Sequence, residues 1–156
     1  MYKSLIFYIT TLLLLFTLPA SAAEIKKEDK NDDGKTDYWL YYENEKPVKI
    51  ETDRNYDGEL DLWIFYKKQG ERRTEIDLNF DGKPDMYTEH KYGQRAKFEI
   101  DKDYDGVIDQ RIEYRNGKAI KVERDTDSDG DLEVIFDLSK YRKNVIKKID
   151  KDTSSQ

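Results

Sequence analysis

Alternation of hydrophobic and polar residues is the clearest pattern along the chain, and it recurs every 24 residues. In one copy, Ile112 and Tyr114 alternate with Arg111 and Glu113, which is typical of a β-strand with one hydrophobic face. Counted from the first aspartate of each copy, repeat positions 10, 12 and 14 form that face. These positions hold Tyr38, Leu62, Met86, Gln110 and Val134, then Leu40, Ile64, Thr88, Ile112 and Phe136, then Tyr42, Tyr66, His90, Tyr114 and Leu138. Each copy is therefore predicted to contain a strand of about six residues.

A turn and a second strand follow in each copy. The predicted turns are Asn44-Glu45-Lys46, Gln69-Gly70, Tyr92-Gly93 and Asn116-Gly117, and Asn-Gly is the strongest short hairpin signal. Position 22, on the second strand, holds Ile50, Thr74, Phe98, Val122 and Ile146, while position 23 holds Glu51, Glu75, Glu99 and Glu123 on the opposite face. Each copy is thus predicted to be a β-hairpin.

The predicted fold class is all-β, because an acidic loop, two strands and a turn fill the 24 positions and leave no room for a helix. We expect an antiparallel meander of tandem 24-residue β-hairpins with about ten strands. Its form is an open curved sheet, a solenoid or a barrel-like closure, among which the pattern does not choose. Residues 23–150 are predicted to form this five-unit repeat domain, and residues 151–156 a flexible polar tail.

Five acidic segments, each nine residues long, separate the hairpins. Their sequences are DKNDDGKTD (29–37), DRNYDGELD (53–61), DLNFDGKPD (77–85), DKDYDGVID (101–109) and DTDSDGDLE (125–133). Aspartate and glycine are ordinary turn residues, so plain solvated turns are the alternative interpretation. Five copies in register, with oxygen-bearing side chains at four fixed positions, favour a metal-binding loop instead.

The loop spacing predicts a site for a hard cation. Side-chain oxygens stand at loop positions 1, 3, 5 and 9, a backbone carbonyl is available at position 7, and glycine at position 6 permits a sharp turn around an ion. Ca²⁺ fits best, because it accepts about 6–8 flexible oxygen ligands whereas Mg²⁺ demands a strict octahedron. Up to five Ca²⁺ ions are expected. The predicted ligands are Asp29, Asn31, Asp33, Lys35 and Asp37; Asp53, Asn55, Asp57, Glu59 and Asp61; Asp77, Asn79, Asp81, Lys83 and Asp85; Asp101, Asp103, Asp105, Val107 and Asp109; and Asp125, Asp127, Asp129, Asp131 and Glu133, with position 7 acting through its carbonyl.

The loops resemble known calcium sites. Their first six positions are similar to the EF-hand loop, but an EF-hand requires a bidentate glutamate at position 12, where this chain has Leu40, Ile64, Thr88, Ile112 and Phe136. The oxygen ligand at position 9 is closer to the DxDxDGxxD strand-loop-strand sites of integrin-type and FG-GAP β-propeller repeats, whose blades are much longer. The hairpin period resembles MORN-type or YwqK-type arrays without their glycine pattern. These resemblances imply Ca²⁺ in the loops. Without the bidentate glutamate, the expected dissociation constants are about 10⁻⁴ to 10⁻³ M.

The N-terminus predicts export from the cytoplasm. Lys3 precedes the hydrophobic run from Leu5 to Leu18, and Ala20-Ser21-Ala22 forms a small-residue cleavage site, so residues 1–22 are predicted to be a cleavable signal peptide. The expected location is secreted or periplasmic, with no membrane span after cleavage. An uncleaved N-terminal anchor is the alternative, although the run is short for a span of about 20 residues.

Composition narrows the function further. The chain has 34 acidic and 28 basic residues in mixed order, a balance that argues against nucleic acid as a partner. With no cysteine and one histidine, disulfides, thiol catalysis and His- or Cys-based zinc sites are excluded. Catalysis requires an asymmetric site, yet only His90 and residues 139–144 break the repeat, so a non-enzymatic protein is predicted.

Aromatic residues mark a second candidate site on the face opposite the hydrophobic positions. Trp39, Trp63 and Tyr87 occupy repeat position 11, and Tyr41 and Phe65 occupy position 13. Equivalent strands lie about 9.6 Å apart, so these rings form a row that could stack on sugars, unless closure of the sheet or a partner buries them. The expected function is a calcium-binding structural or interaction protein that contacts a cell-envelope protein or a polysaccharide. The alternative is a calcium-stabilised carbohydrate-binding module.

Overall fold

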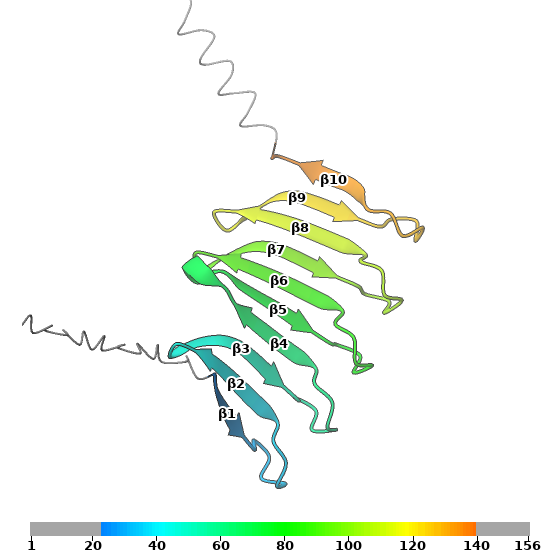
Figure 1. Ribbon diagram of the computed structural model, residues 1–156. Helices are drawn as coiled ribbons and strands as arrows, with labels where there is room; N and C mark the ends of the chain where they lie inside the picture. The colour runs from blue at the N-terminus through cyan, green and yellow to red at the C-terminus, as the bar shows by residue number, and fades with distance from the viewer. Residues whose placement is uncertain (1–22, 140–156) are drawn as a thin grey trace, which may run out of the picture.

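The computed structural model describes residues 23–139, which form one ten-stranded antiparallel sheet with a single 3-10 turn. The strands follow one another across the sheet in chain order, from β1 at one edge to β10 at the other (Figure 1). The elements are β1 (Glu24–Glu28), β2 (Tyr38–Glu43), β3 (Lys46–Thr52), β4 (Leu62–Tyr66), η1 (Lys68–Gly70), β5 (Arg72–Ile76), β6 (Met86–Lys91), β7 (Gln94–Ile100), β8 (Gln110–Arg115), β9 (Lys118–Arg124) and β10 (Glu133–Asp137). The predicted all-β meander is confirmed, and the sheet is open rather than closed into a barrel.

The ten strands differ from the predicted set at both ends. Strand β1 precedes the first acidic loop and was not predicted. The predicted second strand of the fifth copy, around Ile146, lies outside the described residues, as do the predicted signal peptide and the predicted tail at 151–156. Within residues 23–139, no helix is long and apolar enough to cross a membrane.

All four predicted turns join the expected strands, and each has two consecutive residues with positive φ. The pairs are Asn44 and Glu45 (50° and 62°), Gln69 and Gly70 (63° and 75°), Tyr92 and Gly93 (51° and 75°), and Asn116 and Gly117 (51° and 72°). Two positive φ values in succession match the right-handed twist of the flanking strands, which explains the Asn-Gly and X-Gly preference. The turns therefore fix the register of each hairpin.

The strand register separates the two faces of the sheet as the sequence predicts. On the hydrophobic face, a central row crosses the sheet through Leu40, Ile50, Ile64, Thr74, Thr88, Phe98, Ile112, Val122 and Phe136. A second row, nearer the acidic loops, includes Leu62, Ile76, Met86 and Ile100. On the opposite face, which we call the mixed face, Trp39, Glu51, Trp63, Glu75, Tyr87, Glu99, Arg111 and Glu123 alternate across the strands.

Strand β10 departs from this register. A bulge between Val134 and Phe136 places Val134 opposite Glu123, on the mixed face, while Phe136 stays opposite Val122. The prediction that Val134 belongs to the hydrophobic face was therefore wrong. A bulge adds one residue to one strand, so residues on its two sides no longer follow a single period-two pattern.

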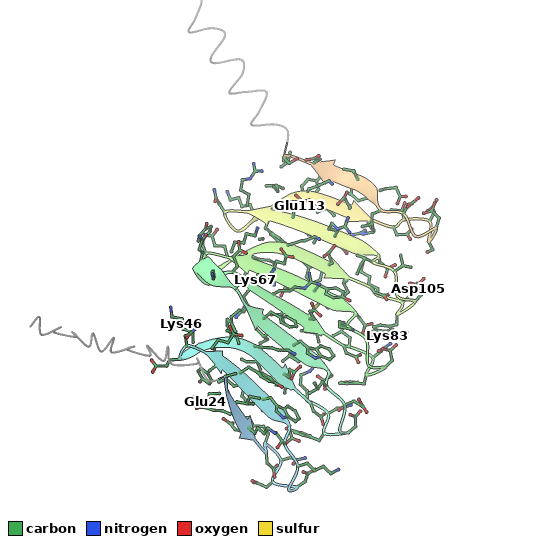
Figure 2. All side chains as sticks on the ribbon, in the orientation of Figure 1. Glu24, Lys46, Lys67, Lys83, Asp105 and Glu113 are labelled. Carbon is green, nitrogen blue, oxygen red and sulfur yellow. The ribbon has the colours of Figure 1, made fainter. Side chains whose placement is uncertain are left out.

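The sheet is one layer thick, and no hydrophobic residue in the described part is fully buried. Strand side chains project from both faces of the ribbon (Figure 2). The buried residues are instead carboxylates, namely Asp37, Asp53, Asp61, Asp77, Asp85, Glu99, Asp101 and Glu123. Burying a charge without a partner is costly, so each of these carboxylates requires hydrogen-bond donors or a cation nearby.

Candidate metal centres

The five acidic loops lie side by side along one edge of the sheet, and the hairpin turns lie along the other (Figure 1). Each loop connects the end of one strand to the start of the next. Its ends are joined by the backbone N–H of position 9, which donates to the carbonyl of the residue preceding position 1, as in Asp37 to Glu28 at 3.0 Å and Asp85 to Ile76 at 2.9 Å. The loops are thus held in a fixed frame by the sheet ladder.

The position-1 aspartate organises each loop by accepting backbone hydrogen bonds from within it. In the third loop the two Asp77 carboxylate oxygens accept from the N–H groups of Phe80 and Gly82, at 2.6 and 2.7 Å. Asp53, Asp101 and Asp125 accept from the same two positions of their own loops, and Asp29 accepts from Asp33 and Gly34. Asp77 Oδ1 also accepts from the N–H of Asp81 at 3.3 Å, whereas Oδ2 accepts from Gly82 alone. Each carboxylate oxygen has two acceptor sites, so an oxygen with one N–H bond has room for a cation.

Unusual backbone angles at two positions make this pattern possible. Position 4 has a φ of 61° to 64° in every loop, although its residues are Asp32, Tyr56, Phe80, Tyr104 and Ser128. Glycine at position 6 has a φ between 88° and 101°, which side-chain-bearing residues rarely adopt. A bulky residue in the left-handed region is uncommon and costs free energy. The same strained conformation in five loops indicates that the loops are specified structures rather than ordinary turns.

The carboxylates at positions 5 and 9 are also held by backbone hydrogen bonds within each loop. The position-5 carboxylate accepts from the N–H of position 7, as in Lys35 to Asp33 at 2.8 Å. The position-9 carboxylate accepts from the N–H of position 2, as in Lys30 to Asp37 and Thr126 to Glu133, at 2.8 and 2.9 Å. These backbone hydrogen bonds fix and orient one oxygen of each side chain, as the neighbours of a metal ligand usually do.

Six of the ten carboxylates at positions 1 and 9 form a buried ladder from the first loop to the fourth, whereas Asp29 is exposed and Asp109, Asp125 and Glu133 are half-buried. The lowest exposed fractions in the described part of the chain, 1–3%, belong to six aspartates: Asp37, Asp53, Asp61, Asp77, Asp85 and Asp101. The N–H of position 1 in one loop donates to the carbonyl of position 9 in the preceding loop, as in Asp53 to Asp37 and Asp101 to Asp85, at 2.9 and 2.8 Å. Adjacent loops are therefore hydrogen-bonded to one another.

Few side-chain cations neutralise this ladder. Within the described loops, Arg54 forms an ion pair with Asp61 and donates to the Asp77 carbonyl at 2.7 Å. The Arg54 guanidinium also lies over the Phe80 ring, 5.7 Å from its centroid, so this one residue links the second loop to the third. The role of Arg54 was not predicted from the sequence. Position 2 holds lysine in the first and fourth loops, leucine in the third and threonine in the fifth, so the repeat does not mark it.

The fourth and fifth loops bring their carboxylates together most closely. One oxygen from each of Asp101, Asp103 and Asp109 lies within 4.8 Å of the others, and the same holds for Asp125, Asp127 and Glu133. These are predicted ligands at positions 1, 3 and 9. Three oxygens at that separation can surround one hard cation.

The residue at position 3 sets the local electrostatics. In the first three loops it is asparagine, whose amide donates to the position-5 carboxylate, as in Asn55 to Asp57 at 2.8 Å. Backbone and amide hydrogen bonds lower the pKa of Asp33 and Asp57. In the last two loops position 3 is aspartate. Desolvation followed by repulsion from Asp105 and Asp109 raises the pKa of Asp103, and repulsion from neighbouring carboxylates, chiefly Asp129, raises that of Asp127.

Replacing Asp103 with asparagine should therefore have opposite effects with and without metal. In the metal-free chain, the raised pKa means that ionised Asp103 is disfavoured in the fold, so its penalty grows as pH rises above about 3.8, the unperturbed value. D103N should increase the β-sheet circular dichroism that remains in chelator near neutral pH, because it removes repulsion. In Ca²⁺ it should weaken the fourth site by roughly three- to tenfold, because one ligand charge is lost. Circular dichroism in chelator and calorimetric titration with Ca²⁺ check both signs, with N79D as the reverse exchange in the third loop. A drop in both conditions would contradict this account.

The predicted aromatic residues also gather, on the mixed face. Trp39, Trp63 and Tyr87 lie in one row, with Glu51 and Glu75 from the intervening strands between them. Tyr41 and Phe65 lie in the adjacent row on either side of Lys49.

Cations cover part of this aromatic row. The Lys49 ammonium lies 5.5 Å from the ring centroids of both Tyr41 and Phe65, and Arg73 lies 5.1 Å from that of Tyr87. The Tyr41 hydroxyl donates to Glu51, which raises the Tyr41 pKa to about 12. The row of Trp39, Trp63 and Tyr87 thus has the ring arrangement of a sugar-binding strip. The rings of the adjacent row, Tyr41 and Phe65, already interact with Lys49.

His90, the repeat-breaking histidine, has no catalytic partner among the described residues. Its Nδ1 is buried without a hydrogen-bond partner in the described part. Desolvation, then repulsion from Arg72 and Arg95, lowers its pKa. The neutral imidazole is therefore favoured at this site.

Comparisons of the chain with protein-family models, with curated protein sequences and with solved structures found no match.

Proposed function

We propose that the protein is a secreted or periplasmic, non-enzymatic calcium-binding scaffold whose five loops bind Ca²⁺ to stabilise a one-layer β-sheet. The observation that supports this best is the inversion of normal burial. Among the described residues, the buried side chains are all carboxylates, six of them aspartates at loop positions 1 and 9, while no hydrophobic side chain is buried. A fold built this way needs a partner for its buried charge, and an ion at each loop would provide it.

The chemistry of the loops favours Ca²⁺ over other cations. The candidate ligands at positions 1, 3, 5 and 9 are all oxygens, whereas zinc and copper sites prefer nitrogen or sulfur ligands. The loops vary at position 3 and in their carboxylate count, and Ca²⁺ tolerates such variation better than the strict octahedral geometry of Mg²⁺ does. The expected affinity suits a calcium-rich exterior rather than a cytosolic signal.

Calorimetric titration of Ca²⁺ into the chelator-treated mature chain tests the proposal. We expect close to five ions per chain, and a matched titration with Mg²⁺ should give much weaker heats. The quintuple variant with position-1 aspartates replaced by asparagine should bind no Ca²⁺ with measurable heat. No heat from the wild-type chain, together with a full β-sheet circular dichroism spectrum in chelator, would contradict the proposal.

A carbohydrate-binding role is the second candidate, and the register favours it by placing Trp39, Trp63 and Tyr87 in a single row. A co-sedimentation assay with insoluble polysaccharides tests it. The W39A/W63A double variant should lose retention, whereas I64A, on the other face of β4, should keep it. Equal retention of both variants would exclude the aromatic row as the binding surface.

A further inference from the structure

We infer that the hydrophobic face of the sheet is the interface of a homodimer, in which two copies pack face to face into a two-layer β-sandwich. The inference goes beyond the proposed calcium function and does not depend on which ion fills the loops. Four features of the described residues support it: the composition of the face, its area, its rim and the charges at its two edges.

The composition of the face is that of an interface centre. From β2 to β10 the central row, Leu40 to Phe136, contains no charged residue, and the adjoining row contributes Leu62, Ile76, Met86 and Ile100, with Arg124 on β9. Strand β1 adds only charged residues to this face, Glu24, Lys26 and Glu28, so the hydrophobic surface runs from β2 to β10. None of these side chains is fully buried in the single chain. The mixed face differs sharply, because its charges neutralise one another in pairs such as Arg111 with Glu99 at 2.7 Å and Lys121 with Glu123 at 2.6 Å. A sheet with one hydrophobic face must bury it against another layer, and the described chain supplies none.

The area of the face matches what a stable dimer requires. The nine strands β2 to β10 at about 4.8 Å spacing, each with roughly five residues at about 3.3 Å, give a face of about 700 Å². Standard protein interfaces bury about 800 Å² per partner, so a second copy covers the face completely.

The rim of the face has the residues that surround interface centres. On the side of the hairpin turns, Tyr42, Tyr66, His90 and Tyr114 lie beyond the central row. Arg95 from β7 lies over the Phe98 and Tyr114 rings, with its carbon 5.8 and 5.6 Å from their centroids. Tyrosine and arginine are enriched in protein interfaces, whereas aspartate, glutamate and lysine are depleted at their centres.

Charges at the two edges of the sheet select one relative orientation. Three of the four turns, at residues 67–72, 91–95 and 115–118, each carry a net charge of +2, while the acidic loops carry −2 to −5 without metal and 0 to −3 with one Ca²⁺ in each. In Figure 2, Lys46 and Lys67 lie at the turn edge and Asp105 lies at the loop edge. A two-fold axis running across the strands would place the loop edge of each copy over the turn edge of the other. The alternative axis, parallel to the strands, would bring basic turns together and is disfavoured.

In this orientation, residues in the middle of the central row face the same residues of the second copy. Thr74 on β5 and Thr88 on β6 pair directly at the centre of the ten-stranded sheet. An axis along the central row brings each threonine close to the same residue of the second copy, as an isologous interface requires. The two small side chains, flanked by Ile64 and Phe98, allow the layers to approach to the usual distance of about 10 Å.

Site-specific cross-linking tests the interface and its orientation, because the chain has no native cysteine. In saturating Ca²⁺, T74C should form a covalent dimer with a short bis-maleimide linker. The matched control E75C lies on the same strand but on the mixed face and should remain monomeric. Equal cross-linking of both variants, or none with T74C, would overturn the proposed interface.

Sedimentation equilibrium supplies an independent measurement on the unlinked mature chain. The wild-type chain should sediment as a dimer in Ca²⁺. T88K, which places an unpaired charge in the interface, should raise the dimer dissociation constant by about tenfold or more, whereas the neighbouring E89K on the mixed face should not. Circular dichroism confirms that each variant keeps its sheet. A wild-type monomer that binds five Ca²⁺ ions would overturn the dimer and leave the calcium function standing, whereas a dimer without Ca²⁺ binding would do the reverse.

Discussion

Removing calcium from the mature chain is expected to abolish most of its β-sheet signal at ambient temperature. At 10 mM Ca²⁺ and dissociation constants of about 10⁻⁴ to 10⁻³ M, each bound ion stabilises the fold by about 1.4–2.7 kcal/mol, and five together by about 7–14 kcal/mol. That range equals the whole stability of an ordinary domain. The sheet has no buried hydrophobic residue in its described part with which to replace it.

Thermal melts followed by circular dichroism, at Ca²⁺ concentrations from chelator up to 10 mM, check this expectation. The melting temperature should change little until the Ca²⁺ concentration approaches the dissociation constants, and should then rise with the logarithm of the Ca²⁺ concentration even after all sites are filled. Titration with NaCl to the same ionic strength is the control, because screening alone should move the transition little. A melting temperature that does not change with Ca²⁺ would exclude any role for the ion in the fold.

The D77N substitution is expected to be the most damaging single change in the loops. Asp77 is 1% exposed, and its two carboxylate oxygens accept from Phe80 and Gly82. An asparagine side chain would turn an NH₂ group toward one of these N–H donors, leaving a buried donor unpaired, and would remove a ligand charge. We expect a loss of about 2–4 kcal/mol in the free energy of unfolding in Ca²⁺, and four bound ions instead of five.

The matched control is the same chemical change at a position outside the site. Asp32 occupies position 4 of the first loop, is exposed, and has a φ of 61°, which asparagine adopts readily. D32N should leave both the ion count and the stability within about 0.5 kcal/mol of the wild type. Urea unfolding in Ca²⁺ and calorimetry measure the two variants. Equal losses for D32N and D77N would mean that loop charge alone, rather than a specific ligand, controls stability.

The repeat length made the fold predictable from sequence. A strict 24-residue period fixed the limits of every hairpin, and the turns carried residues such as Asn116-Gly117 that accept positive φ. The alternation of Ile112 with Arg111 and Glu113 then assigned the two faces. The candidate loop ligands were predicted from their spacing, and the structure brings together Asp101, Asp103 and Asp109 in the fourth loop and Asp125, Asp127 and Glu133 in the fifth.

Three features could not be predicted, each for a distinct physical reason. Strand β1 has Lys26 and Lys27 where other copies have residues such as Ile50 and Glu51, so its strand pattern is hidden by charges suited to an exposed edge. In β10, Val134, Ile135 and Phe136 are all hydrophobic, and a run without alternation does not define a register. Burial of the aspartates was also invisible, because it arises from the stacking of neighbouring loops and not from any single loop.

The order of strands in the sheet has a mechanical consequence. Strands β1 and β10 are the two edges of one open meander, so tension applied between the ends of the described chain acts across the strands rather than along them. Hydrogen bonds are then loaded one pair at a time, as in a zipper, instead of being sheared together. Extension would release one hairpin after another, each adding the contour length of 24 residues, or about 80 Å. An ion in each loop would resist only the unfolding of its own hairpin. The molecule would therefore extend under force in equal steps, one for each hairpin.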